Sequence, residues 1–179
     1  MNNNLYFLAI LFPEQISKEI IQLKSEIATI TQSKHALKIP PHITIIPPFQ
    51  CKQEDLSSIL PLLDSVICNG KPFSTTCHNF GSFRKDVLFI NCEPSNEAFR
   101  LRDELKVILP NLFKRDYGAW HPHITLAFRD LSEAGFTKGK QYLETKNYHC
   151  EFQTHEITLL HQVNGMWQAH HTFKLNSVS

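Results

Sequence analysis

The sequence predicts an α+β fold of two half-domains related by a pseudo-two-fold axis. Three observations support this prediction. The tetrapeptide PHIT occurs twice, so that His42 and His123 lie 81 positions apart. Each copy follows an apolar run, a proline and an amphipathic segment at matching spacing, and such self-similarity indicates a duplicated unit. The linkers are short and contain no Gly/Ser-rich or charged tract, which argues against independently folded domains.

The first half predicts the order strand, helix, strand, helix, strand. The apolar run 5–12 meets Pro13, which suits the first turn of a helix because a missing N–H costs nothing there. Apolar residues then recur at helical spacing, at Ile16, Ile20, Leu23 and Ile27. The strand with the first PHIT is followed by a predicted helix at 54–66 and a predicted strand at 73–83.

The second half predicts the same order. An apolar run from Val87 meets Pro94, and helical spacing follows at Phe99, Leu101, Leu105 and Ile108. The second PHIT precedes a predicted helix within 131–143. A strand-like run, CEFQTHEITLL, then begins at Cys150.

One more strand completes the chain. An Asn-Gly pair at 164–165 is typical of a hairpin turn, so the segment 166–175 is predicted to be a final strand. The 179 residues are enough for one domain with a substantial core. We therefore expect a single domain, residues 1–179, whose duplicated halves are about 1–84 and 85–179.

Composition argues against several classes of protein. The chain is 42% hydrophobic and 20% charged with a formal net charge of +1, so no global field attracts polyanions or an anionic membrane. The N-terminal apolar run is too short to span a bilayer and lacks the features of a signal peptide. Five scattered cysteines without a CxxC pattern indicate reduced thiols. We expect a cytoplasmic protein without membrane association.

The two PHIT segments each place an imidazole beside a hydroxyl. Alternate residues of a strand point to the same face. In the first strand, one face is predicted to carry His42, Thr44 and Ile46. In the second strand, the matching face is predicted to carry His123, Thr125 and Ala127. The residues between them, and Phe128, are predicted to face the other way. If the halves pack about a two-fold axis, the two His-Thr pairs meet across a central groove.

Two opposed imidazoles and two hydroxyls suit the chemistry of a phosphodiester. One imidazole can take the proton of the attacking oxygen while the other protonates the leaving oxygen. The hydroxyls can donate hydrogen bonds to the non-bridging oxygens, and this scheme requires no metal ion. A single His-x-Thr pair is more often a structural or surface feature. Its recurrence at matching positions of a duplication favours the catalytic interpretation.

These motifs resemble those of the two-histidine (2H) phosphoesterases, which include bacterial 2′-5′ RNA ligase-like proteins and cyclic nucleotide phosphodiesterases. The resemblance rests on PHITII at 41–46 and PHITLAF at 122–128, with support from the opening strand–Pro–helix and the closing ITLLHQVNGMW segment. It covers most of the chain. It implies two α+β lobes, each an antiparallel sheet with flanking helices, around a central cleft.

The resemblance also implies roles for four residues. His42 and His123 are the expected catalytic pair, and Thr44 and Thr125 are the expected phosphate-binding hydroxyls. The usual assignment in cyclic phosphodiesterases makes His42 the acid and His123 the base. Because the site is symmetric, either histidine can be the acid and the other the base. In a ligation reaction the two roles are reversed. No cofactor or metal is expected, and a monomer suffices because the two lobes complete one site.

Five further residues are candidates for contact with substrate. Phe49 follows a Pro-Pro turn and could stack on a base at the mouth of the cleft, or belong to the core. Phe83 with Arg84 could contact a base or a phosphate, or form an ordinary hairpin tip. Tyr6 and Trp120 are candidate residues of the cleft.

The predicted function is metal-independent hydrolysis of 2′,3′-cyclic phosphates, with an RNA end or a small nucleotide as partner. One alternative is a 2′-5′ RNA ligase or another small phosphoester hydrolase on the same site. Another is a non-catalytic RNA- or nucleotide-binding module that keeps the cleft. A metal-binding protein is the third alternative, because the chain has ten histidines, although they show no HExxH spacing.

Overall fold

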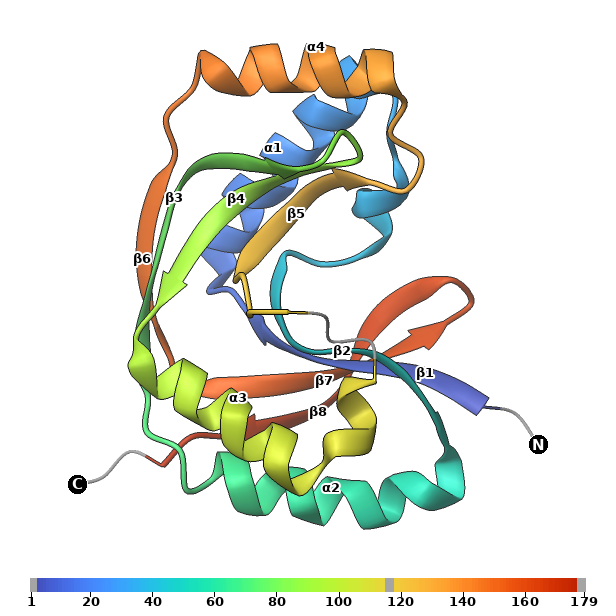
Figure 1. Ribbon diagram of the computed structural model, residues 1–179, viewed down its shortest axis with the longest axis vertical. Coiled ribbons are helices and arrows are strands. Elements are labelled where there is room, and N and C mark those ends of the chain that lie inside the picture. The colour runs from blue at the N-terminus through green and yellow to red at the C-terminus, as the bar shows by residue number, and fades with distance from the viewer. Residues whose placement is uncertain (1–2, 115–117, 177–179) are drawn as a thin grey trace.

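The computed structural model describes residues 3–114 and 118–176 (Figure 1). The elements are β1 (Asn3–Leu11), α1 (Glu14–Thr31), η1 (His35–Lys38), β2 (His42–Lys52), α2 (Gln53–Ile67), β3 (Phe73–Phe83), β4 (Val87–Pro94), α3 (Asn96–Ile108), η2 (Pro110–Phe113), β5 (His123–Phe128), α4 (Glu133–Glu144), β6 (His149–Thr154), β7 (Glu156–Val163) and β8 (Met166–Lys174), where η denotes a 3₁₀ helix. The predicted repeat is confirmed, since β1-α1-β2-α2-β3 recurs as β4-α3-β5-α4-β6 before β7 and β8.

Two four-stranded antiparallel sheets form the α+β fold that the sequence predicts. Their strand orders are β2-β1-β7-β8 and β5-β4-β3-β6. Each strand that carries a PHIT motif, β2 or β5, therefore lies at the edge of its sheet. Figure 1 shows α2 and α3 against the lower sheet, and α1 and α4 against the upper one.

The division of the chain into halves differs from its division into sheets. β3 precedes residue 84 but pairs with β4 and β6, whereas β7 pairs with β1 and β8. The prediction of one strand from Cys150 is wrong, because the chain breaks at His155 into β6 and β7, which belong to different sheets. Helix α1 also crosses over to pack on α4 and β5. One cluster of buried residues consequently joins both lobes.

A β-bulge in each edge strand changes which residues face the cleft. Ile45 is the extra residue where β2 pairs with β1, and Leu126 is the extra residue where β5 pairs with β4. An inserted residue redirects the side chains that follow it. The prediction that Ile46 and Ala127 share the face of the histidines is therefore wrong, because both are fully buried in the core. Phe128, predicted to face the other way, lines the cleft.

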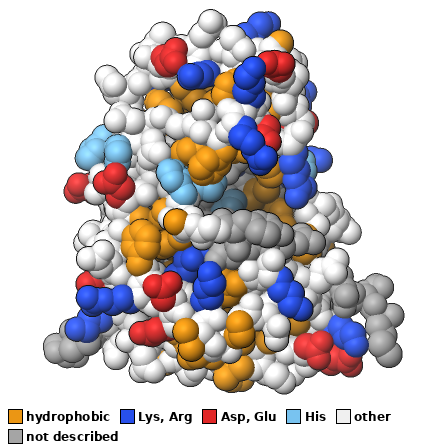
Figure 2. All heavy atoms as spheres, in the orientation of Figure 1, with side chains coloured by type: hydrophobic (Ala, Val, Ile, Leu, Met, Phe, Trp, Pro, Cys, Tyr) orange, Lys and Arg blue, Asp and Glu red, His pale blue; other side chains and the backbone are white. Residues whose placement is uncertain are grey.

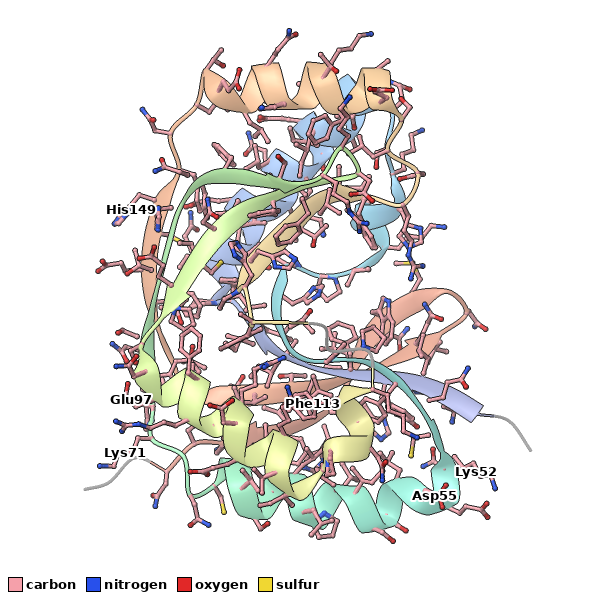
Figure 3. All side chains as sticks on the ribbon, viewed as in Figure 1. Lys52, Asp55, Lys71, Glu97, Phe113 and His149 are labelled. Atoms are coloured by element: carbon pink, nitrogen blue, oxygen red, sulfur yellow. The ribbon has the colours of Figure 1, made fainter. Side chains whose placement is uncertain are left out.

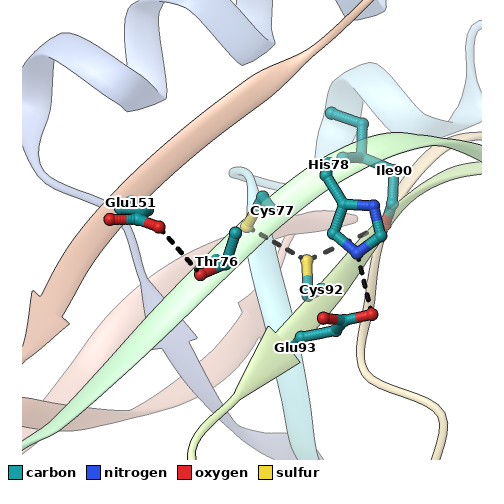
Figure 4. A network of polar contacts seen from close by, with 7 residues as sticks. All are labelled: Thr76, Cys77, His78, Ile90, Cys92, Glu93 and Glu151. Carbon is teal, nitrogen blue, oxygen red and sulfur yellow. Dashed lines mark hydrogen bonds and ion pairs between the residues drawn. The ribbon is translucent and has the colours of Figure 1, made fainter.

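The β3–β4 pairing brings two thiols together. Cys77 and Cys92 are cross-strand partners, and their Sγ atoms lie 3.3 Å apart (Figure 4). All five cysteines are free thiols, as the sequence predicts. Nearby, Nε2 of His78 lies 2.8 Å from a carboxylate oxygen of Glu93 (Figure 4). Both contacts join adjacent strands of the sheet that carries β5.

Charged and polar side chains lie mainly at the surface, and apolar side chains lie mainly in the interior. Figure 3 shows Asp55, Lys71 and His149 at the outer surface, whereas Phe113, next to β2, is turned inward and is 5% exposed. Within residues 3–114 and 118–176, no helix combines the length and the hydropathy needed to cross a membrane.

Candidate active site

The predicted histidines and threonines come together between the two lobes. His42 begins β2 and His123 begins β5, and these two edge strands contact each other. A cavity of ≈ 400 Å³ is lined by His42, Thr44 and Thr125. A second cavity of ≈ 440 Å³ is lined by Thr44 and His123, so the two cavities adjoin at Thr44. Figure 2 shows histidine side chains gathered at the hollow in the middle of this face.

Both histidines are held in the same tautomer. Nδ1 of His42 lies 2.8 Å from the carbonyl oxygen of Pro40, and Nδ1 of His123 lies 2.7 Å from that of His121. A carbonyl oxygen only accepts, so Nδ1 carries the proton and donates in each ring. Nε2 of each neutral ring therefore keeps its lone pair. This atom can accept a proton and, once protonated, can donate one.

A phenylalanine from the neighbouring strand packs against each histidine. The ring of Phe7 on β1 lies 4.7 Å from that of His42, and Phe89 on β4 lies 5.1 Å from His123, centroid to centroid. Sequence reasoning missed this pair. The signal was present, because Phe7 and Phe89 are the third residues of the matching runs LYF and VLF.

Three cationic side chains line the cleft, and sequence reasoning missed all of them. Lys24 and Arg129 line the first cavity and Arg102 lines the second, while no Asp or Glu among the described residues lines either. Lys24 is 3% exposed, and its Nζ donates to the carbonyl oxygen of Ile39 at 2.6 Å. Lys24 follows Ile20 by four positions on the buried face of α1, and a charge on an apolar face was a usable signal. The cleft suits an anionic ligand.

Burial governs the protonation of the two histidines. It lowers the pKa of His42 from 6.5 to about 4, with smaller contributions from the charges of Lys24 and His123. Burial also lowers the pKa of His123. The pKa of Lys24 falls to about 8 for the same reason. At neutral pH the unliganded cleft therefore holds two neutral imidazoles beside a mostly charged ammonium group.

Two predicted substrate-binding residues belong to the core instead. Tyr6 is 0% exposed and its hydroxyl donates to Oε1 of Gln53 at 3.2 Å. Phe49 is 7% exposed and lies in the main core cluster with Tyr6. For Phe49 this position fits the core alternative that the sequence left open, and for Tyr6 it leaves no ring surface exposed to the cleft. On β1 it is the next residue, Phe7, that faces the cleft, because neighbouring side chains of a strand point to opposite faces.

Phe83 and Arg84 lie next to each other at the end of β3, but only Phe83 lines the cleft. Phe83 is half-buried, lines the second cavity and has its ring centroid 5.0 Å from that of His123. Its contact with substrate stays a prediction. Arg84 lines neither cavity and is exposed in a left-handed backbone conformation, with Nε 3.9 Å from a carboxylate oxygen of Asp86. Its position fits the alternative, an ordinary hairpin tip.

Trp120 and Arg102 bind the edge of β2 from the second half of the chain. The indole N–H of Trp120 donates to the carbonyl oxygen of Thr44 at 2.9 Å, and Nε of Arg102 donates to that of Ile45 at 3.1 Å. The guanidinium of Arg102 lies 5.3 Å from the ring of Phe113 and 5.2 Å from that of Trp120. Edge-strand carbonyls that would otherwise lack partners are thereby satisfied beside the cleft.

We expect Trp120→Phe to lower the free energy of unfolding by about 1 kcal/mol, because the Thr44 carbonyl loses its donor. Urea denaturation followed by circular dichroism measures the change. Phe99→Leu is the matched control, since Phe99 packs on the indole at 4.9 Å and its loss leaves the N–H in place. Unchanged stability of Trp120→Phe would show that the hydrogen bond contributes nothing.

The ten histidines suggested a metal site as one alternative. Within the described part of the chain, no group of three or more His, Cys, Asp or Glu side chains is placed to hold a metal ion.

Comparisons with known proteins match most of the chain. The sequence profile of the 2′-5′ RNA ligase superfamily matches residues 12–165. A Bacillus cereus (strain B4264) protein named "Putative phosphoesterase" is 31% identical over 171 residues, covering 93% of this chain and 94% of its own length. A protein of the same name from Bacillus mycoides (strain KBAB4) is 31% identical over 172 residues, with the same coverage.

Solved structures show the same fold. The crystal structure of E. coli LigT in apo form superposes with a TM-score of 0.72 at 19% identity, covering 99% of this chain and 100% of LigT. The protein TT0787 of Thermus thermophilus superposes with a TM-score of 0.69 at 16% identity, covering 97% of this chain and 100% of its own. The profile spans well over half of the chain, and the Bacillus relatives resemble it along nearly its full length. The chain therefore belongs to the 2′-5′ RNA ligase superfamily of two-histidine phosphoesterases.

Proposed function

We propose that the protein is a metal-independent phosphodiesterase that hydrolyses 2′,3′-cyclic phosphates of RNA ends or small nucleotides. One observation supports this above the others: two imidazoles of identical tautomer line one cleft together with two threonines, on facing edge strands. Paired proton donors and acceptors on opposite sides of one phosphate are what an in-line displacement needs.

The proposed reaction has three parts. Nε2 of His123 takes a proton from water, whose oxygen attacks the phosphorus and forms a new P–O bond. The bond from phosphorus to one ribose oxygen breaks, and Nε2 of protonated His42 gives its proton to that oxygen. The hydroxyls of Thr44 and Thr125 donate to the non-bridging oxygens as charge builds there. His42 is neutral in the free cleft, so it has to gain its proton when the anionic phosphodiester raises its pKa.

The anion-binding character of the cleft supports the substrate class. Lys24 and Arg129 line the first cavity beside His42, and the described residues place no carboxylate on its wall. E. coli LigT, which has this fold, was crystallised with 3′-AMP and with phosphate. Each cavity falls within the size range of small-molecule sites.

Turnover of defined substrates tests the proposal. Purified protein is incubated with 2′,3′-cyclic AMP, with RNA ending in a 2′,3′-cyclic phosphate, with 2′-5′-linked dinucleotides and with linear phosphomonoesters, each with and without a chelator. We expect hydrolysis of the cyclic phosphates and no effect of the chelator. Formation of 2′-5′ bonds from cleaved RNA would favour the ligase, and binding without turnover across the panel would favour a non-catalytic module.

A further inference from the structure

Three cysteine thiols lie in a row across the sheet that carries β5. Cys77 on β3 is paired in register with Cys92 on β4 and with Cys150 on β6. Residues directly opposite one another on antiparallel strands point to the same face of the sheet. Here that face is the buried one, because Cys77 and Cys92 belong to the main core cluster and Cys150 packs against it. None of the five cysteines, all of which lie in the described residues, lines either cavity of the cleft, so the row is separate from the candidate active site.

The two thiol pairs differ in the hydrogen bonding of their backbones. The N–H of Cys92 donates to the carbonyl oxygen of Pro122 at 3.2 Å, on the side of β4 that faces β5. Because the N–H and C=O of one strand residue point to the same side, Cys77 and Cys92 exchange no backbone hydrogen bond. In such pairs the side chains approach more closely than in the hydrogen-bonded pairs with which they alternate. Cys77 directs its own backbone groups to β6, so its pair with Cys150 is of the hydrogen-bonded kind.

Cys77 and Cys92 need little movement to form a disulfide. Their Sγ atoms lie 3.3 Å apart (Figure 4), and a disulfide bond is about 2.0 Å long, so the sulfur atoms have to approach by about 1.3 Å. The Cα separation typical of a non-hydrogen-bonded pair, about 4.5 Å, lies within the range found in disulfides. This pair is therefore the favoured end point for oxidation of the row.

Only one thiol of the row is reached from solvent. Cys77 is 0% exposed and Cys92 is 4% exposed, whereas Cys150 is half-buried on the edge strand β6. A hydrogen bond with Cys77 and burial raise the pKa of Cys150 above its ordinary value, so little thiolate is present at neutral pH and oxidation is slow there. The Tyr148 hydroxyl is buried beside Cys150, and no nitrogen or oxygen atom of a described residue bonds to it. An oxygen atom added to the Cys150 sulfur would give this O–H group an acceptor.

We propose that this row is a thiol relay, in which a hydroperoxide oxidises Cys150 and the oxidation ends as a disulfide between Cys77 and Cys92. The Cys150 thiolate attacks hydrogen peroxide, an S–O bond forms, the O–O bond breaks, and the released hydroxide takes up the Cys150 proton to become water. The sulfur of Cys77 then attacks that of the Cys150 sulfenic acid, forming an S–S bond and releasing a second water that carries away the Cys77 proton. Cys92 next attacks Cys77, and Cys150 leaves as a thiol with the proton of Cys92. Two thiols thereby lose two electrons and two protons, and one hydrogen peroxide is reduced to two waters.

The relay ends beside the strand segment that supports His123. Asn91, next to Cys92, is the register partner of His123, and the Cys92 N–H holds the carbonyl of Pro122, the residue before His123. The disulfide would fix β4 to β3 at this point. The inference does not rest on the proposed function, because the disulfide is detected without measuring turnover.

Peptide mapping of the peroxide-treated protein tests the proposal. Cys68→Ser is the background, since it removes the exposed thiol that lies outside the row. Trypsin places the three cysteines of the row on separate peptides. After exposure to excess hydrogen peroxide at mildly alkaline pH, acid quenching and alkylation in denaturant, we expect cross-linked peptides that carry Cys77 and Cys92, the loss of two free thiols, and reversal by dithiothreitol. A final product linked through Cys77 and Cys150, or the absence of any disulfide from the row, would overturn the proposal.

Two variants separate the steps of the relay. Cys150→Ser leaves the buried pair intact but removes the thiol that solvent reaches, so disulfide formation should slow at least about tenfold. Cys92→Ala should leave a disulfide between Cys77 and Cys150, because the last exchange is lost. Cys51→Ala is the matched control, since it removes a buried thiol outside the row and should keep the rate of the background protein.

The variants also give the results that would contradict the relay. An unchanged rate in Cys150→Ser would show that the buried pair reacts directly, and would overturn it. A Cys92→Ala protein without a disulfide between Cys77 and Cys150 would overturn it as well. Circular dichroism verifies the fold of each variant. If Cys92→Ala does not fold, Cys150→Ser decides alone, because its half-buried position accepts a serine of nearly the same shape.

Discussion

Replacing either His42 or His123 by alanine is expected to lower kcat for 2′,3′-cyclic AMP about a thousandfold. Each substitution removes one of the two proton transfers, and positioned acid or base catalysis contributes roughly 10²–10⁴-fold. Single-turnover rates measured with saturating enzyme report the chemical step directly. The backbone carbonyls that orient the rings, those of Pro40 and His121, are unchanged by either substitution.

The matched control is His155→Asn. His155 is exposed, and it joins β6 to β7 at a distance from both cavities. Its substitution should leave kcat within about twofold of wild type, since replacing an exposed residue that lines neither cavity has little effect on the folded protein. Full activity in either alanine variant would refute the paired mechanism.

The same variants distinguish the acid from the base. A nucleoside 3′-(p-nitrophenyl) phosphate has a leaving group acidic enough to depart without a proton. The acid variant should regain much of its rate on this ester, whereas the base variant should not. With the proposed polarity, His42→Ala is the variant that recovers. Recovery of His123→Ala instead would exchange the two roles.

The order of elements could be predicted because it depends on local pattern. Apolar runs, prolines and helical spacing are properties of short segments, and the strands and helices that they predict appear in the structure. Two details differ: Pro94 ends β4 and does not enter the helix, and Phe99 and Ile108 of α3 are exposed. Sheet membership could not be predicted in this way. The run from Cys150 is continuous in sequence, yet β6 and β7 separate because each finds a partner in a different sheet. Long-range pairing of this kind leaves no mark on local periodicity.

The same distinction between local pattern and long-range pairing applies to the residues of the candidate site. His42 and His123 could be identified because the motif repeats, and Thr44 and Thr125 follow from strand alternation. Alternation then failed two residues later in each strand, at Ile46 and Ala127, because each edge strand has a bulge; the bulge in β5 also turns Phe128 to the cleft. Bulges occur at sheet edges and beside functional sites, and the pairing that defines them involves another strand.

The position of Lys24 in the cleft could not be predicted from the sequence, for a different reason. Helix α1 begins after β1 of the lower sheet but packs against α4 and β5 of the upper lobe. Only this crossing places a lysine from α1 in the cleft near His42, where its charge lowers the pKa of that histidine. A charged residue on a buried helical face was visible in the sequence. Its destination depended on which lobe the helix covers.

His42 is also expected to make the protein sensitive to acid. Its pKa is lowered from 6.5 to about 4 in the folded state, so the unfolded chain binds the proton more tightly. Stability from this group is fully present above pH 6.5 and is lost as the pH falls toward 4. A difference of this size corresponds to about 3 kcal/mol of unfolding free energy over that window. Lowered pKa values at His35, His123 and His161 act in the same direction.

His42→Asn isolates this contribution, because an asparagine amide can donate to the Pro40 carbonyl from a position close to that of Nδ1 but takes up no proton. Urea denaturation at several pH values between 4 and 7 gives the unfolding free energy of the wild type, of His42→Asn and of the exposed control His155→Asn. The wild type and the control should lose stability in parallel on acidification, and His42→Asn should lose about 3 kcal/mol less. Parallel curves for all three proteins would mean that the imidazole of His42 can be protonated in the cleft without loss of stability. Burial of the neutral imidazole of His42 would then carry no cost in acid.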